Sequence, residues 1–370
     1  MSYAGEIVSP QPPPPIPGGP LVWMSRNLFQ SATSSVVTVI LAVTIGYCSV
    51  KLLQWGIFAA VWTVPAATVE GTAQCRLDDS GACWALVAEK YRFILFGLYP
   101  FAEQWRASLA IVVLISLFVA SVQRRLWGGP IIVVWILGLT AVYVLMAGGV
   151  LGLTSVSEDR WGGLPVTLML ASTGMTLSFP IAILVALGRL SDNPSLRFIC
   201  YLYVELIRGV PLISVLFMAS VLFPLLLPDG ITISKLLRAQ AAIVIFIAAY
   251  LSEIIRAGLQ SLNRGQSEAA TALGLGYWQS TFLIRLPQAL AMALPAIVNL
   301  LIGFFKNTSL VMTIGIFDLL NAAKSSAAEP AWQEFGTEAY LFAATIYFAF
   351  CFAMSRYGLR LERRLRHGRG

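Results

Sequence analysis

Eight long runs of apolar residues, almost free of charged side chains, most constrain how this chain can fold. Each has close to the ~20 apolar residues that a helix needs to cross about 30 Å of hydrocarbon. Within a bilayer the backbone has to satisfy its own hydrogen bonds, so such runs form helices. Only 12% of the residues are charged, about half the usual share in soluble domains. We therefore predict an all-α polytopic membrane protein with spans at about 34–51, 107–122, 130–151, 164–187, 210–227, 237–258, 289–305 and 339–356.

The arginines between these runs predict an orientation. An even number of spans places both termini on one side, and the side richer in Lys and Arg faces the cytoplasm. Most arginines lie on one side, at 124–125, 189–208, 256–285 and after Ser355, and the short loops of the other side carry few basic residues. We therefore expect both termini in the cytoplasm. The first apolar run is long and lacks a convincing cleavage site, so we expect it to be retained as a span.

Four segments follow from this topology. Residues 1–33 include the run PQPPPPIPGGP and are expected to form a disordered cytoplasmic tail. Residues 34–160 form an extension with three spans and a periplasmic loop at about 63–106. Residues 161–356 form a core of five spans with a cytoplasmic loop at 259–287, and residues 357–370 form a basic cytoplasmic tail.

The cysteines, the histidine and the lysines restrict the chemistry. Cys75 and Cys83 share the predicted periplasmic loop, where a disulfide is chemically allowed and two free thiols fit equally well. His367 is the only histidine and no CxxC occurs, so we expect no metal site. No lysine follows a glycine, so the phosphate-binding pattern GK[ST] is missing. We expect no ATPase activity, no catalytic residue and no cofactor on this chain.

The stretch from Ser267 to Pro287 is too polar to lie in lipid and predicts two short helices. Ser267 is a suitable N-cap. Gly274 and Gly276 should end the first helix. A second helix should run from about Tyr277 until Pro287 interrupts it. The apolar face of the first helix consists of Ala269, Ala272 and Leu273.

The spacing within this stretch is Glu-Ala-Ala, three residues, Gly, nine residues, Ile, one residue, Leu-Pro. It resembles the EAA motif of ABC importer permeases. The resemblance implies a coupling helix that fits a groove on a cytoplasmic ATPase, and an ordinary cytosolic helical hairpin is the alternative. The residues that it assigns to ATPase coupling are Arg264, Gly265, Gln266, Glu268, Ala269, Ala270, Gly274, Ile284, Leu286 and Pro287.

Residues from about Trp161 to the C-terminus resemble the permease domain of the polar amino-acid branch of these importers. The matching positions are Gly163, Thr167, Leu168, Glu205, Arg208, Gly209, Pro211, Leu212, Tyr250, Glu253, Arg256, Gly258, Gly265, Gln266, Glu268, Lys306, Thr308, Ser309 and Leu310. Val210 stands where the branch usually has Thr. The extension resembles the extended permease of the general L-amino-acid importer at Cys83, Trp84, Gly97, Tyr99, Pro100, Glu103, Trp105 and Arg106.

The resemblance implies a permease subunit of an importer for L-amino acids in the bacterial inner membrane. It implies two cytoplasmic ATP-binding subunits that hold ATP and Mg²⁺, a periplasmic amino-acid-binding protein and a second permease, usually a different chain. No nucleic-acid partner is expected. The alternative is a secondary amino-acid transporter driven by an ion gradient, but such a protein should carry charged relays in mid-span.

Two groups are candidates for the substrate path. Glu253 and Arg256 could act as a gate or recognise the charged ends of an amino acid, or form an i,i+3 ion pair at the interface. Asn307, Thr308 and Ser309 could bind a zwitterion near a broken helix. Their hydroxyls could equally bond to carbonyls of their own helix.

Overall fold

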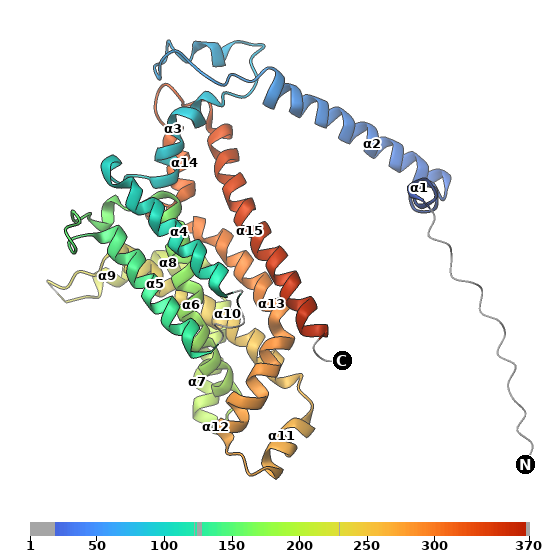
Figure 1. Cartoon of the computed structure of the whole chain (residues 1–370), viewed down its shortest axis with the longest axis vertical. Coiled ribbons are helices and arrows are strands. Elements are labelled where there is room, and N and C mark those ends of the chain that lie inside the picture. The colour runs from blue at the N-terminus through green and yellow to red at the C-terminus, as the bar shows by residue number, and fades with distance from the viewer. Residues whose placement is uncertain (1–18, 122, 124–127, 229, 368–370) are drawn as a thin grey trace, which may run out of the picture. The chain divides into compact units, whose positions relative to one another are not determined.

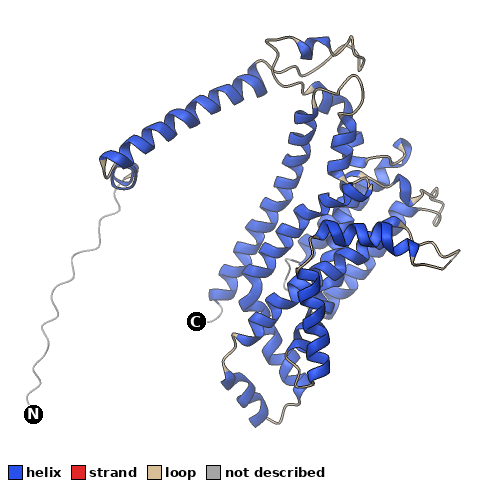
Figure 2. Cartoon of the chain, turned by 180° about the vertical axis from the view of Figure 1, so that it is seen from behind, coloured by secondary structure: helices blue, strands red, loops and turns tan. Residues whose placement is uncertain are grey.

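The computed structural model describes residues 19–121, 123, 128–228 and 230–367. The regular elements in these ranges are helices, apart from two isolated β-bridges (Figure 2). They form two compact units: Met1–Val61 with Gln74–Cys83, and Trp62–Ala73 with Trp84–Gly370. The division expected after residue 160 does not coincide with these units, because residues 84–160 group with the five-span core. The Pro-rich run before residue 19, Arg124, Arg125 and the last three residues of the basic tail lie outside the described residues.

The first unit carries the first predicted span. Its helices are α1 (Pro20–Leu28), α2 (Ala32–Leu53) and the π-helix η1 (Gln54–Phe58), and its second segment holds most of the 3₁₀ turn η2 (Ala73–Arg76). Residues 20–28 were expected in a disordered tail, yet they are helical. Pro20 stands in the first turn of α1, where a missing N–H has no consequence. The hydroxyls of Ser34 and Thr38 donate to the carbonyl of Leu28 and hold α1 against α2. A disulfide joins Cys75 to Cys83.

Seven helical stretches in the described residues are long and apolar enough to cross a membrane. The prediction of an all-α polytopic fold is therefore confirmed. The remaining predicted span, 210–227, is shorter than expected and belongs to a bent pair. The seven stretches are Ala32–Phe58, Phe101–Ser121, Gly129–Ala147, Gly163–Arg189, Lys235–Gln260, Tyr277–Ile314 and Gly336–Arg363.

The bent pair consists of α7 (Pro194–Arg208) and a helical run formed by α8 (Leu212–Phe217), the π-helix η6 (Met218–Leu222) and α9 (Phe223–Leu225). The two parts meet at 102°. The bend falls between Arg208 and Leu212 because Pro211 has no N–H to continue α7 and disfavours helical backbone in the residue before it. The second part would rise only about 21 Å, which is too short to cross the hydrocarbon alone.

The core of the second unit is the packing of α6 (Gly163–Arg189) along α10 (Lys235–Gln260) (Figure 1). Small residues allow this close approach, as is usual between membrane helices. A Cβ added to Gly174 would come within 2.7 Å of Ile243. On another face α10 meets α13 (Leu286–Asn307), where a Cβ on Gly258 would lie 2.7 Å from the carbonyl oxygen of Ala289. Since Gly258 is near the end of α10 and Ala289 near the start of α13, the two helices run antiparallel.

The remaining helices of this unit cover that core. Within the extension, α4 (Gln104–Ser121) follows the 3₁₀ turn η3 (Phe101–Glu103) and packs against α5 (Gly129–Ala147) and α6. The expected periplasmic loop contains α3 (Ala85–Phe96), which packs on α14 (Leu319–Ser326) and α15 (Gly336–His367). Two 3₁₀ segments, η5 (Glu158–Arg160) and η8 (Thr308–Ile314), connect the longer helices. Figure 1 shows α3 and α14 at one end of this unit and α11 and α12 at the other.

Candidate functional site

The helix α11 (Arg264–Ala272) occupies the predicted coupling loop and begins earlier than the sequence suggested. Asn263 is its N-cap, and the side-chain oxygen accepts a hydrogen bond from the N–H of Gly265 at 3.0 Å. The prediction of Ser267 as N-cap is wrong, because the helix begins about one turn earlier, where the side chain of Asn263 accepts from a free N–H of the first turn. Ser267 lies inside the helix instead, and its carbonyl accepts from the hydroxyl of Thr271.

Gly274 ends α11, as the sequence predicted. Its φ of +73° lies in the left-handed region. Its N–H donates to the carbonyl of Thr271, and the next N–H, of Leu275, donates to the carbonyl of Ala270. These two bonds form a Schellman motif, for which glycine is the favoured residue. The helix α11 is therefore capped at both ends.

The second helix starts at Tyr277 but is not interrupted at Pro287. It runs through α12 (Tyr277–Gln279), the π-helix η7 (Ser280–Arg285) and α13. The predicted interruption is wrong, because Pro287 is the second residue of α13, which directly follows the π-helix. The change from π to α hydrogen bonding leaves a carbonyl without its usual donor there, so the missing N–H of proline is tolerated. This part of the chain is a continuous helical rod that leads from the loop into a membrane span.

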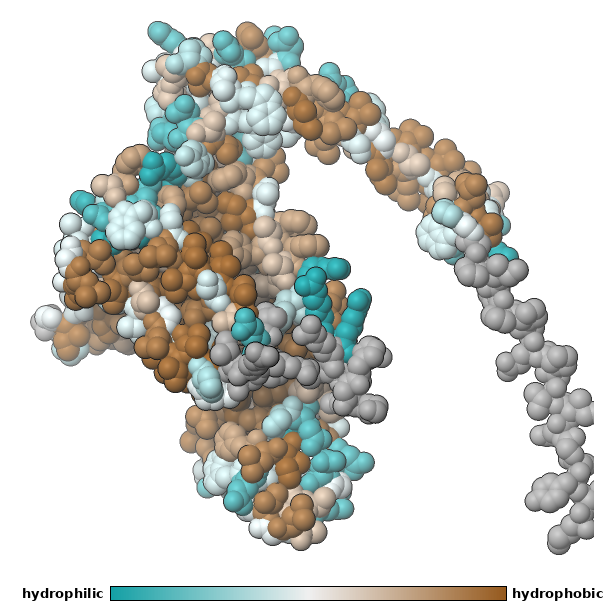
Figure 3. Space-filling view, in the orientation of Figure 1, coloured by the Kyte–Doolittle hydropathy of each residue, from teal (hydrophilic) through white to brown (hydrophobic). Residues whose placement is uncertain are grey.

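The residues predicted to couple to an ATPase divide between an inner and an outer face of the loop. Ala270 and Leu286 are buried, and Ile284 is half-buried. The amide of Gln288 donates to the side-chain oxygen of Gln266 at 3.1 Å and ties α11 to α13. The residues of the outer face are exposed. At the lower end of Figure 3, hydrophobic patches (brown) lie among hydrophilic residues (teal). The members of the outer face are Arg264, Gly265, Glu268, Ala269, Ala272, Leu273, Gly274, Tyr277, Trp278 and Pro287.

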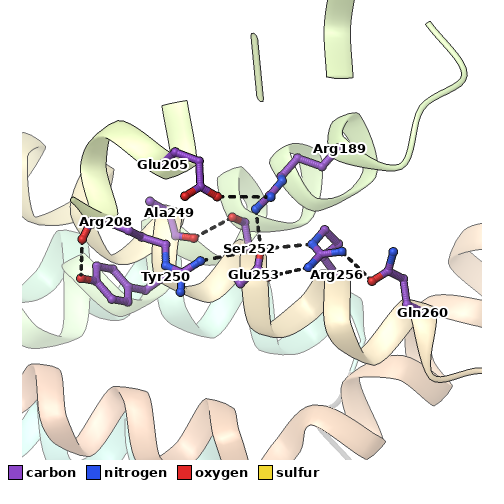
Figure 4. Close-up of polar contacts among 9 residues, drawn as sticks. All are labelled: Arg189, Glu205, Arg208, Ala249, Tyr250, Ser252, Glu253, Arg256 and Gln260. Carbon is purple, nitrogen blue, oxygen red and sulfur yellow. Dashed lines mark hydrogen bonds and ion pairs between the residues drawn. The ribbon is translucent and has the colours of Figure 1, made fainter. Parts of the chain in front are cut away.

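A cluster of charged side chains lies at the ends of α6, α7 and α10 (Figure 4). Glu253 is its centre: Arg256 donates to it at 2.5 Å and Arg189 donates to its other oxygen. Arg208 approaches the same carboxylate at 4.0 Å, and Glu205 contacts Arg189 at 3.6 Å. Glu205 and Arg208, which are also three residues apart, thus pair across helices. The structure contains the i,i+3 ion pair of Glu253 and Arg256 and extends it into a network of three helices.

The two predicted groups of the substrate path are not brought together. Asn307, Thr308 and Ser309 lie at the junction of α13 and η8, and Glu253 and Arg256 lie near the opposite end of the antiparallel α10. The hydroxyl of Thr308 is buried and donates to the carbonyl of Phe305 at 2.7 Å. The hydroxyl of Ser309 donates to the carbonyl of Lys306 at 2.8 Å. Both hydroxyls therefore bond within their own helical segment.

Asp318 is a fully buried carboxylate that the sequence patterns did not single out. It caps α14 by accepting from the N–H groups of Leu320 and Asn321, and Tyr347 lies 3.4 Å from one of its oxygens. Burial raises the pKa of Asp318 from 3.8 to about 6, although the backbone hydrogen bonds oppose this. Thr167 of α6 accepts from the N–H of Leu319, so this corner joins α6, α14 and α15. In the sequence, the only indication of this N-cap was that an aspartate stands directly before a short helical run.

Three of the extension residues that resemble an extended permease, Tyr99, Glu103 and Arg106, form a clamp. Arg106 is fully buried and donates to the carbonyls of Leu145 and Thr154 at 2.8 and 2.9 Å. Glu103 contacts Arg106 at 3.3 Å and accepts from the hydroxyl of Thr154. The phenol of Tyr99 donates to the end of α5, and burial raises its pKa. These residues fix the start of α4 against the end of α5, which is a structural role.

The family model and the sequence relatives agree on one family. Its sequence model, described as the inner membrane component of binding-protein-dependent transport systems, matches residues 178–367. The inner membrane amino-acid ABC transporter permease protein YhdY of Escherichia coli (strain K12) is 40% identical, over 94% of each chain. The glutamate/glutamine/aspartate/asparagine transport system permease protein BztC of Rhodobacter capsulatus is 34% identical over 98% of this chain and 97% of its own. A solved amino acid ABC transporter with histidines is 31% identical over 55% of this chain and 92% of that one, with a TM-score of 0.49.

Proposed function

Because the chain belongs to the family of binding-protein-dependent transport system inner membrane components, we propose that it is the permease subunit of an ABC importer that moves L-amino acids into the cytoplasm. The transport functions named for the two full-length relatives support amino acids as the cargo. The structural observation that supports the coupling role is α11, a short helix that is capped at both ends and has an exposed apolar face. An ion-gradient mechanism has no support from this family.

The coupling loop is proposed to transmit force from the ATPase. Two cytoplasmic subunits bind ATP and Mg²⁺, and one of them holds the outer face of α11. Asn263 and Gly274 keep α11 rigid, and Gln266 links it to α13. Because η7 continues into α13, a displacement of α11 reaches the membrane span directly. The displacement of α13 then passes to α10 at Gly258, because the backbones of the two helices touch at this glycine without intervening side chains.

The charge cluster is proposed to work as a latch beside this loop rather than as a cargo site. Glu253 already accepts from Arg189 and Arg256, so its oxygens are occupied. A latch of ion pairs between α6, α7 and α10 has two arrangements, paired and separated, which a transporter with two access states requires. Asn307, Thr308 and Ser309, at the other end of α10, remain candidates for contact with cargo.

The orientation and the partners complete the proposal. Both termini and the coupling loop face the cytoplasm, and the end with α3 and α14 faces the periplasm, where a disulfide between Cys75 and Cys83 is stable. A periplasmic amino-acid-binding protein delivers cargo to that end. A second permease, a different chain, forms the other half of the path. The disulfide and the clamp around Arg106 stabilise the periplasmic parts of the extension.

The proposal is tested by reconstituting the complete transporter with its ATPase and binding protein. Glu268→Lys reverses a charge on the outer face, and Gly274→Ala strains a left-handed backbone position that is open to solvent. Both should reduce ATPase association and ATP-driven amino-acid uptake. Gly276→Ala is the matched control, since φ of Gly276 is −68° and its Cβ meets nothing closer than 3.7 Å. Full uptake by both variants would refute the coupling role.

A further inference from the structure

A cavity of about 420 Å³ lies at the end of the second unit opposite the coupling loop. Lys235, the first residue of α10, lines it, and α10 rises about 39 Å before the chain enters α11. The other walls come from residues 157–161, which precede α6, from residues 315–317, which follow η8, and from Leu98. The volume lies within the ~300–1,000 Å³ range of small-molecule sites.

Two carboxylates and one ammonium group line this cavity. They are Glu158, Asp159 and Lys235. In the described ranges of the chain, none of the three takes part in an ion pair or a side-chain hydrogen bond. The Oε2 atom of Glu158 is buried, and no described residue is its hydrogen-bond partner. A buried carboxylate oxygen without a donor is costly, so a ligand that brings a hydrogen-bond donor to the Glu158 carboxylate would stabilise it.

The backbone holds these charges at separate walls of the cavity. Gly315 has a φ of +76°, and a Cβ added to it would lie 3.5 Å from Nζ of Lys235. The ammonium of Lys235 therefore lies beside the turn that ends η8. Glu158 and Asp159 lie in η5, immediately before the start of α6. The cavity thus presents carboxylates from one segment and an ammonium from another.

The rest of the lining is mainly apolar. Leu98, Trp161 and Phe317 are among its members. A ligand that fits this composition carries one positive and one negative group close together, with an uncharged body. A dication or an inorganic anion would match only one of the two charges present. An α-amino acid carries the required pair of groups on a single carbon atom, Cα.

We propose that this cavity binds the zwitterionic head of an amino acid at the outer end of the permease. Glu158 and Asp159 bind the α-ammonium group, and Lys235 binds the α-carboxylate. The inference rests on the proposed function, because it takes the cargo to be an amino acid. Two carboxylates and one ammonium leave an excess of one negative charge at the cavity. An acidic side chain is therefore repelled, and neutral or basic amino acids are preferred.

The test is equilibrium binding of radiolabelled L-glutamine to the complete transporter in nanodiscs, without the binding protein. L-Glutamate has nearly the same shape and one more negative charge, so it should compete less well. Two further competitors each lack one group of the head: 4-carbamoylbutanoate has no ammonium, and the glutamine methyl ester has no carboxylate. Both should compete at least about tenfold more weakly than L-glutamine, since each forfeits one charge-assisted contact.

Substitutions of the lining residues test whether L-glutamine binds in this cavity. Lys235→Gln and Glu158→Gln should each weaken L-glutamine binding about tenfold, and Lys235→Arg should restore most of it. Arg160→Gln is the matched control, because Arg160 follows Asp159 directly but does not line the cavity. Unchanged binding in both cavity variants, or no L-glutamine binding by the parent up to millimolar concentration, would overturn the proposal. ATP-driven uptake by the parent, measured in parallel with the binding protein present, separates this failure from a failure of the importer function.

Discussion

Arg189, the last residue of α6, donates a hydrogen bond to Glu253 of α10 at the end of the molecule that leads into α11. Their side chains are 10% and 24% exposed, so solvent screens this ion pair only partly. Arg256 binds the same carboxylate from within α10. An ion pair therefore joins the last residue of α6 to α10 about two turns before α10 ends, close to the predicted coupling loop.

Glu253→Gln should loosen this junction. The substitution leaves the largely buried guanidinium of Arg189 with only the more distant carboxylate of Glu205, which should lower the free energy of unfolding by about 1–2 kcal/mol. Glu205→Gln is the control. Glu205 is 47% exposed and lies 3.6 Å from the same arginine, so its loss should change stability by less than about 0.5 kcal/mol. Thermal unfolding of both variants in detergent measures the difference, and equal effects would show that Glu253 is not the centre of the cluster.

Most of the fold could be predicted from the sequence, because spans are set by the length of apolar runs. Hydropathy located seven spans, and the run at 210–227 belongs to a bent pair that is long enough for an eighth span only together with α7. Pro211 indicates a bend, but its angle depends on the packing of α7 and α8 against α10. The helices α3 and α14 were missed because they are short and their stability comes from packing on each other, which no local pattern reveals.

In the predicted coupling loop, the end of the first helix and the start of the second were predictable because their signals are local, whereas the N-cap and the interruption at Pro287 were predicted wrongly. Gly274 marks a helix end by its own backbone preference, and the spacing to Leu286 and Pro287 is fixed in the sequence. The charge cluster was only half predictable. The pair of Glu253 and Arg256 lies three residues apart, but Arg189 reaches it from 64 positions away. Contacts of that kind depend on how helices pack.

Gly163→Ala should destabilise the protein. The φ of Gly163 is +67°, and an added Cβ would stand 2.2 Å from the backbone oxygen of Leu95. The conformational strain alone should cost about 1–2 kcal/mol, and the clash with α3 adds to it. Gly303→Ala in α13 is the control, because its Cβ meets nothing within 4 Å and alanine favours a helix by about 0.5–1 kcal/mol. Opposite shifts in the unfolding temperature are expected, and a neutral Gly163→Ala would contradict the close approach.

Asp318→Asn should change how stability depends on pH. The pKa of Asp318 is raised to about 6 in the folded protein from 3.8, so the folded state retains the proton longer than the unfolded chain. Its contribution is most favourable below pH 4 and is lost as the pH rises through 6. Asparagine keeps the cap of α14 and cannot ionise. The variant should therefore gain up to about 3 kcal/mol relative to the parent between pH 4 and 7. Chemical denaturation at several pH values measures this gap, and a constant gap would show that Asp318 titrates normally.

The most direct test of the coupling role is to locate the ATPase by photo-crosslinking in the assembled transporter. A photoreactive amino acid is placed at Leu273, which is 77% exposed on the outer face of the coupling loop. A second variant carries it at Tyr91 of α3, which is 46% exposed at the opposite end. We predict a covalent adduct with the ATP-binding subunit from position 273 and none from position 91. An adduct from position 91, or none from position 273 while the ATPase still co-purifies, would contradict the assignment of this loop as the coupling element.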